Sequence, residues 1–167
     1  MGKTDDNLKA AFAGESQANQ RYLNFAKKAE QDGFPNIAHL FRSAAAAETV
    51  HAGNHLRVAQ GIGETLDNLK TARAGENGEI ESMYPGFIAE AKKEKNEEAE
   101  ETFNLALQVE KLHRDLYGKA IKSLEAGKDL PPKLMFVCRG CGNTVEGAPP
   151  EKCPICGAPQ HWFMLIT

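Results

Sequence analysis

The stretch Glu110-Lys111-Leu112-His113 decides how this sequence is interpreted, together with its counterpart Glu48-Thr49-Val50-His51. Each is a Glu-x-x-His pair. Residues three positions apart lie on the same face of an α-helix, so the carboxylate and the imidazole of each pair converge. Two such pairs on neighbouring helices predict a place where two metal ions bind.

Apolar residues recur at helical spacing over most of the chain. The predicted helices span residues 5–31, 35–60, 73–94 and 96–126. Glu15 lies on the apolar stripe of the first helix, and Glu76 and Glu79 lie on that of the third. We predict a short helical or irregular crossover over residues 65–71. The expected fold class is therefore an all-α four-helix bundle, followed by a small β module.

The apolar stripes would bury several carboxylates and imidazoles without a Lys or Arg on the same stripes. Burying a bare charge is costly, so this set needs compensating cations. Carboxylate and imidazole donors suit iron or manganese, and carboxylates can bridge two ions. The alternative is a bundle core whose polar residues satisfy one another. The candidate ligands are Glu15, Glu48, His51, Glu76, Glu79, Glu110 and His113.

Three further residues on these helices have open interpretations. His55 follows His51 by one helical turn and is either another ligand or, as we prefer, a histidine outside the ligand set. Tyr22 and Tyr84 occupy core positions, where each either donates a hydrogen bond to a ligating carboxylate or simply packs.

All four cysteines fall in two Cys-x-x-Cys-Gly motifs, Cys138–Cys141 and Cys153–Cys156. Four thiolates at this spacing bind one tetrahedral metal, zinc or iron. A purely structural zinc ribbon is the alternative to a redox centre. Short apolar runs around the motifs, separated by Gly and Pro, predict a small β-ribbon after a stiff linker at residues 128–133.

Composition excludes several classes of protein. The 167 residues carry a formal net charge of −3 without a basic block, which argues against nucleic acid and anionic lipid as partners. The polar N-terminus lacks the apolar run of a signal peptide, and no run approaches the length of a membrane span. With cysteines placed for metal and not for disulfides, we expect a cytoplasmic protein.

Taken together, these motifs resemble the rubrerythrin family over essentially the whole chain. The resemblance implies a ferritin-like di-iron bundle with its linker over residues 1–133 and a rubredoxin-like four-cysteine iron domain over residues 134–167. It implies that Glu48 and Glu110 bridge two non-haem irons, with Glu15, Glu76 and His113 as terminal ligands. It also implies that Glu79 and His51 exchange on one iron as that iron changes oxidation state.

The resemblance further implies a peroxidase that reduces hydrogen peroxide to water in oxidative-stress defence. Electrons would come from a rubredoxin or an NAD(P)H-dependent reductase through the four-cysteine iron. In the family's head-to-tail dimers, that iron lies close to the di-iron site of the partner. The alternatives are a ferroxidase or iron-storage protein and a non-enzymatic zinc-ribbon sensor. A homodimer or higher homo-oligomer is expected, with helix swapping between subunits left open.

Overall fold

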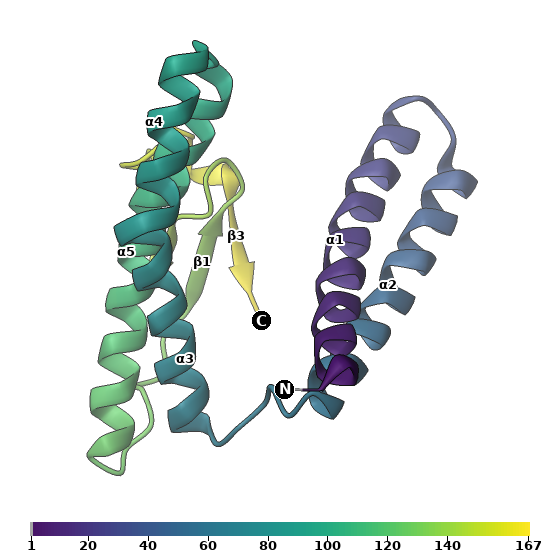
Figure 1. Cartoon of the computed structure of the whole chain (residues 1–167). Coiled ribbons are helices and arrows are strands. Elements are labelled where there is room, and N and C mark those ends of the chain that lie inside the picture. Colours follow the sequence, from purple (N-terminus) through teal and green to yellow (C-terminus); the bar gives the residue numbers. More distant parts are fainter. Residues whose placement is uncertain (1) are drawn as a thin grey trace. The chain divides into compact units, whose positions relative to one another are not determined.

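The computed structural model describes residues 2–167, which form two compact units. Unit 1 extends to Gly63, and unit 2 runs from Glu64 to Thr167. Each unit contains a pair of long helices, and unit 2 also contains the β module (Figure 1). None of the helices within residues 2–167 is both long and apolar enough to cross a membrane.

Unit 1 is a helical hairpin of α1 (Lys3–Gln31) and α2 (Pro35–Val58). Gly33, with φ of +83°, makes the turn, and Pro35 begins α2 at a position where no backbone donor is needed. Small residues let the two helices approach closely. The buried alanines are Ala26, Ala29, Ala38, Ala45 and Ala52.

In unit 2, three helical segments follow one another without a break. They are α3 (Thr65–Gly78), the π-helix η1 (Glu79–Met83) and α4 (Tyr84–Glu94). The backbone stays in the right-handed helical region through both junctions. The helix therefore begins at Thr65, and the irregular alternative for residues 65–71 is wrong, because that segment packs along α5 as regular helix.

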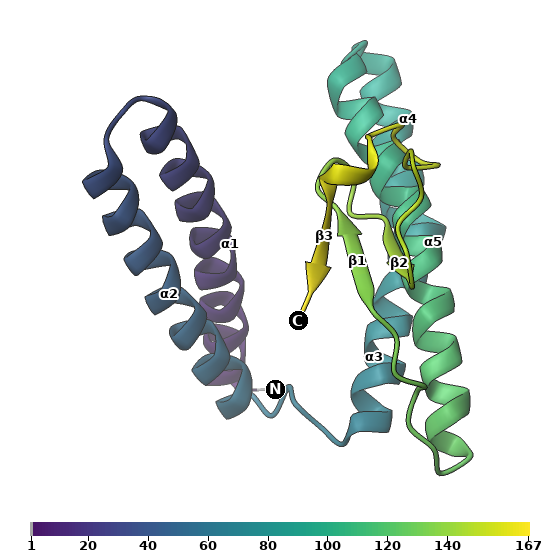
Figure 2. The ribbon, with the colours of Figure 1, turned by 180° about the vertical axis from the view of Figure 1, so that it is seen from behind.

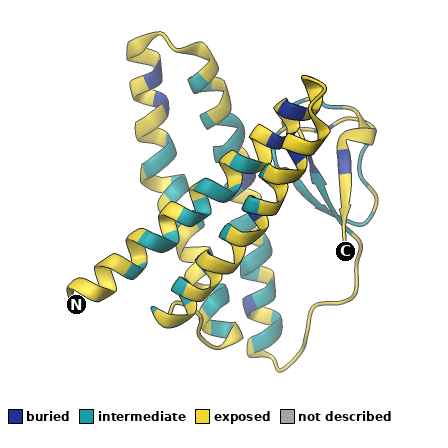
Figure 3. Ribbon diagram, turned by 90° about the vertical axis from the view of Figure 1, so that its right-hand side faces the viewer, coloured by how far each residue is buried: buried dark blue, intermediate teal, exposed yellow. Residues whose placement is uncertain are grey.

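Helix α5 (Glu97–Glu125) packs antiparallel against this interrupted helix. Asn96 caps its N-terminus, with its side chain accepting a hydrogen bond from the backbone of Ala99. Gly127, with φ of +71°, follows the end of the helix, a position where glycine is common because it adopts this backbone conformation without strain. Figure 3 shows that exposed positions cover most of the helical ribbon, with single buried positions recurring along it.

The β module contains β1 (Met135–Cys138), β2 (Thr144–Glu146) and β3 (Phe163–Ile166), with a 3-10 turn, η2 (Gln160–Trp162), before β3. The sheet is antiparallel with the order β2-β1-β3. Cys138, Cys153 and Phe163 form its buried core. Strand β2 contacts α5, and Figure 2 shows it on the α5 side of the sheet.

Candidate metal centres

The first group of metal-ligating side chains lies between α1 and α2 in unit 1. Glu15, Glu48 and His51 each offer one ligand atom, and these atoms lie within 4.8 Å of one another. Nδ1 of His51 is 2.8 Å from Oε2 of Glu48, so the Glu-x-x-His pair converges as predicted. One turn after Glu15, the Asn19 amide donates to the Ala45 carbonyl (2.7 Å) and the Thr49 hydroxyl (2.8 Å), which fixes α1 against α2.

A matching group lies between α3 and α5 in unit 2. Glu76, Glu110 and His113 bring their ligand atoms within 4.8 Å of one another. Nδ1 of His113 is 2.7 Å from Oε2 of Glu110 and 4.0 Å from Oε1 of Glu76. All three side chains are partly buried. In this histidine, as in His51, the nitrogen that faces the carboxylates is Nδ1.

The carboxylates of unit 2 repel one another. Burial, followed by the charge of Glu110, raises the pKa of Glu76 to about 7. Burial and then Glu110 also raise the pKa of Glu79, and burial and then Glu79 raise that of the Tyr84 hydroxyl. A proton or a metal ion must offset the charge of this cluster. A divalent ion relieves the repulsion while using the donors that are present, so the residues fit a carboxylate-bound iron.

Glu79 stands outside the three-residue group although its charge interacts with Glu110 and His113. It is the first residue of the π-helix, a structure that is rare and occurs often at functional sites. Pro85 follows that segment and has no backbone hydrogen to donate to an α-helical bond. The interruption of the helix next to Pro85 thus takes the form of a π-helix that begins at a candidate ligand.

The two helix pairs repeat one pattern of aromatic residues and ligands. The corresponding pairs are Phe41 with Glu48, Phe103 with Glu110, Glu15 with Tyr22, and Glu76 with Tyr84. The first three pairs are seven residues apart and the last is eight residues apart. A π-helical turn accommodates one residue more than an α-helical turn. The π-helix therefore absorbs the additional residue of unit 2 and keeps its aromatic cluster equivalent to that of unit 1.

The four cysteines converge as free thiols in the β module. Sγ of Cys138 is 3.7 Å from that of Cys156, and Sγ of Cys141 is 3.6 Å from that of Cys153. In a tetrahedral site with metal–sulfur bonds of about 2.3 Å, neighbouring sulfurs are about 3.8 Å apart. These separations fit one tetrahedral metal and are far too long for disulfides.

The surroundings of Cys153 stabilise its thiolate form. Burial opposes its ionisation, but backbone donors from Cys156 and Ile155 and the Asn143 amide lower its pKa to about 6. The Asn143 Nδ2 donates to Sγ of Cys153 at 3.5 Å. Burial raises the pKa of Cys141 and of Cys156. A metal that accepts all four thiolates would replace these protons.

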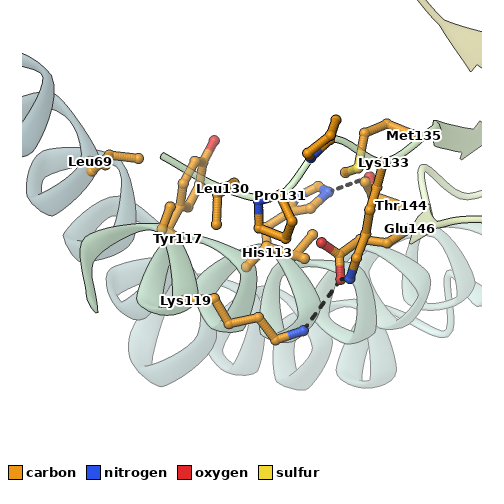
Figure 4. A pocket seen from close by; sticks show the side chains of 13 residues that line it. Leu69, His113, Tyr117, Lys119, Leu130, Pro131, Lys133, Met135, Thr144 and Glu146 are labelled. Carbon is orange, nitrogen blue, oxygen red and sulfur yellow. Dashed lines mark hydrogen bonds and ion pairs between the residues drawn. The ribbon is translucent and has the colours of Figure 1, made fainter. Parts of the chain in front are cut away.

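The sequence did not single out Asn143 or Thr144. Asn143 is 1% exposed, and its Oδ1 has no hydrogen-bond partner within residues 2–167. Thr144, the first residue of β2, places Oγ1 2.9 Å from Nε2 of His113 (Figure 4). The one signal in the sequence is two polar residues directly after Cys141-Gly142. The β module thus contacts a candidate iron ligand of its own chain, whereas we expected it nearer to a partner's site.

The three residues whose roles the sequence left open, Tyr22, Tyr84 and His55, do not belong to the converging ligand groups of the described residues. Tyr22 and Tyr84 pack in aromatic clusters, and Tyr84 also lies close enough to the carboxylates for their charges to raise its pKa. His55 is partly exposed and is not among the converging ligand groups of the described residues.

Comparison with known proteins identifies the protein family to which the chain belongs. The family model for rubrerythrin matches residues 6–121, and that for the rubredoxin-like domain of rubrerythrin matches residues 136–164. The chain belongs to the rubrerythrin family. Members of this family are oxidoreductases. The fold class expected from the sequence, a ferritin-like bundle with a rubredoxin-like domain, is confirmed.

Individual rubrerythrins align along nearly the entire chain. Rubrerythrin-2 of Clostridium acetobutylicum is 37% identical, and the alignment covers 98% of this chain and 96% of that protein. Nigerythrin of Nitratidesulfovibrio vulgaris is 35% identical over 98% of this chain and 86% of its own. A solved structure of nigerythrin in a fully reduced, all-ferrous state has a TM-score of 0.56 at 34% identity, covering 99% of this chain and 88% of that one.

The cofactors expected for a rubrerythrin are confirmed together with the family. They are two non-haem irons in a Glu/His di-iron centre and one iron in a four-cysteine site. Both donor sets fit these ions by the geometry described above.

Proposed function

We propose that this protein is a peroxidase that reduces hydrogen peroxide to water in oxidative-stress defence, with electrons delivered through the four-cysteine iron. The observation that carries the proposal is the hydrogen bond between Thr144 of the β module and His113 of the di-iron group. A storage protein or a zinc-ribbon sensor would not need a thiolate metal site in contact with a ligand of the second centre.

Each candidate ligand has a role in this proposal. Glu48 and Glu110 would bridge the two irons, and Glu15, Glu76, His51 and His113 would act as terminal ligands, in keeping with the two three-residue groups that converge. Glu79 would take the place of His51 on one iron when its oxidation state changes. When bound, two ferrous ions would supply the two electrons and the positive charge needed for cleavage of the O–O bond of peroxide. One peroxide, two electrons and two protons give two waters.

The proposed proton donor is Glu79, which stands outside the three-residue ligand group of unit 2. Burial and then Glu110 raise the pKa of Glu79 in the metal-free protein. While Glu79 is not bound to iron, its carboxyl can hold a proton and transfer it to a departing oxygen. Glu76 also has a raised pKa, but as an iron ligand it would lose its proton to the metal.

We propose a domain boundary at the end of the linker, with the di-iron bundle over residues 1–133 and the four-cysteine domain over residues 134–167.

The external electron donor in the proposal is a rubredoxin or an NAD(P)H-dependent reductase. We place the protein in the cytoplasm, because four free thiols arranged for metal are stable in a reducing compartment.

The di-iron centre requires both helix pairs, and we infer that the pairs which meet come from two copies of the chain. In ferritin-like bundles one long crossover joins helices that run in the same direction. At a rise of 1.5 Å per residue, α2 continues for about 15 Å along its axis from Glu48 to its last residue, Val58. Helix α3 begins at Thr65, about 16 Å along its axis before Glu76.

These lengths set the span of a crossover within one chain. If both helices run in the same direction past one site, their ends lie about 31 Å apart along the bundle axis. The connection comprises the six residues 59–64, which reach about 25 Å when fully extended. The connection is too short, which supports a homodimer in which α1 and α2 of one copy complete the bundle of the other.

Steady-state turnover tests the proposed function. Iron-loaded protein, supplied with NADH, a suitable reductase and a rubredoxin, is expected to consume one NADH for each hydrogen peroxide. Replacing Glu110 with Ala should abolish this turnover while preserving the visible spectrum of the four-cysteine iron. Stoichiometric iron oxidation and mineral deposition without peroxide turnover would instead support the storage function, and zinc at the cysteines would favour the zinc-ribbon sensor.

A further inference from the structure

We propose that Thr144 is a positioning residue that orients His113 and connects the four-cysteine site to this di-iron ligand of the same chain. This inference rests on the proposed function, since it assigns the route by which the electrons reach the peroxide-reducing site.

The hydroxyl of Thr144 has a defined hydrogen-bonding role. It donates to the carbonyl oxygen of Gly142 at 3.1 Å. A threonine hydroxyl has one hydrogen, so toward His113 it can only accept, and the Nε2–H of His113 donates to it at 2.9 Å. The hydrogen therefore stays on Nε2, which leaves the lone pair of Nδ1 for iron on the side of Glu110.

The same hydroxyl completes a short bonded route between the centres. Gly142 directly follows the ligand Cys141, and its N–H donates to the carbonyl of Cys138 at 2.8 Å. From Cys141 the route runs along the backbone to the Gly142 carbonyl, then through the Thr144 hydroxyl to the imidazole of His113. It contains two hydrogen bonds, and both involve Thr144.

Other contacts hold the β module against α5 independently of this hydroxyl. Val109, one turn before His113, is 2% exposed, and its Cγ1 lies 3.8 Å from where a Cβ on Gly142 would be. Glu146, at the end of β2, pairs with Lys119 of α5 at 3.6 Å (Figure 4). Removal of the Thr144 hydroxyl should therefore interrupt the route and leave the module docked.

The electron balance of each transfer is simple. One electron leaves the ferrous four-cysteine iron, which becomes ferric, and reduces one ferric ion of the pair to ferrous. Thr144 and His113 keep their hydrogens, because the route conducts charge without proton transfer. The external one-electron donor then reduces the four-cysteine iron again.

A valine at position 144 keeps the β-branched shape and removes the hydroxyl, so Thr144→Val is the informative variant. Thr144→Ser restores the hydroxyl, and Thr102→Val, at an exposed position of α5, is the matched control. The reduced, iron-loaded protein is mixed with one equivalent of peroxide, and the colour of the oxidised four-cysteine iron is followed by stopped flow. We expect the colour to return about 10- to 100-fold more slowly in Thr144→Val, and at near wild-type rates in the other two variants.

A second measurement does not depend on turnover. In zinc-loaded, diamagnetic protein, proton–nitrogen NMR should detect a slowly exchanging Nε2–H on His113 in wild type and in Thr144→Ser. In Thr144→Val that hydrogen should exchange rapidly, with the zinc content unchanged. An equally protected Nε2–H in Thr144→Val would overturn the assignment.

The outcomes separate this inference from the proposed function. If wild-type colour returns rapidly and Thr144→Val matches it, Thr144 carries no electrons and the inference fails while the peroxidase proposal stands. Equal slowing in Thr144→Val and Thr144→Ser would also overturn it, since the effect would follow packing and not the hydroxyl. If peroxide fails to return the colour in wild type, the proposed function itself fails.

Discussion

At the scale of single residues, Asn143 connects burial to redox tuning. Its buried amide donates to Sγ of Cys153, and such a bond favours the more negatively charged, ferrous state of the site. We expect Asn143→Ala to lower the reduction potential of the four-cysteine iron. A hydrogen bond of about 1 kcal/mol corresponds to about 40 mV for one electron. Spectroelectrochemistry measures the change, with Asn54→Ala, at an exposed position, as the control. A potential equal to that of wild type would contradict this role.

Glu76 makes iron binding depend on pH. Burial and the charge of Glu110 raise its pKa to about 7 in the metal-free protein, so below that pH iron must displace a proton. The apparent affinity of the di-iron centre should therefore rise with pH, by up to about tenfold per unit from this group, and level off above pH 7. Titration with ferrous iron between pH 5.5 and 8 measures the slope.

Glu76→Gln supplies the comparison for that titration, because an amide releases no proton. Below pH 7, the apparent iron affinity of this variant should rise less steeply with pH than that of wild type, by about one released proton. If the slopes of wild type and variant coincide, Glu76 is not the group that iron deprotonates.

The convergence of the two Glu-x-x-His pairs could be predicted from sequence because the motif is local: three residues along a helix determine the geometry. Asn143 and Thr144 could not, because their roles arise from tertiary contacts with Cys153 and His113. Nothing in a Gly-Asn-Thr sequence specifies which side chain will lie next to it in the folded protein.

At the scale of elements, the candidate ligand Glu79 is the first residue of the π-helix. The segment that contains this π-helix makes the spacing from Glu76 to Tyr84 one residue longer than the spacing from Glu15 to Tyr22 in unit 1. We expect Glu79→Ala to slow peroxide turnover by about tenfold or more, because His51 then has no replacement on its iron. The spectrum of the four-cysteine iron should be unchanged.

Glu81→Ala is the matched control for Glu79→Ala, since Glu81 is exposed within the same π-helix. Its turnover should equal that of wild type. Wild-type turnover in Glu79→Ala itself would remove the ligand-exchange role.

The long helices were predictable from sequence because their apolar periodicity extends over many turns. The start of α3 at Thr65 was not, because that segment has few apolar residues and its helical state depends on packing against α5. Strand β2 has three residues, too few to show an alternating pattern. The interruption near Pro85 was predictable, but its π-helical form depends on hydrogen bonding that sequence does not specify.

At the scale of the whole molecule, completion of the bundle by a second chain predicts complementation. Glu48→Ala and Glu110→Ala each should inactivate a homodimer. If unit 1 of one chain joins unit 2 of the other, a mixed dimer contains one site with both mutations and one intact site. Co-expressed and affinity-separated mixed dimers should therefore recover about half of wild-type turnover. Bundles closed within single chains would give mixed dimers without activity.

The central claim is that electrons pass from the four-cysteine iron through the di-iron centre to peroxide. The most direct test is one anaerobic turnover: fully reduced, metal-analysed protein receives one equivalent of hydrogen peroxide while the visible absorption of the four-cysteine iron is recorded. The account predicts rapid return of the oxidised colour in wild type and its loss when Glu110 or His113 is replaced with Ala. A colour that returns equally fast in those variants, or does not return in wild type, would contradict it.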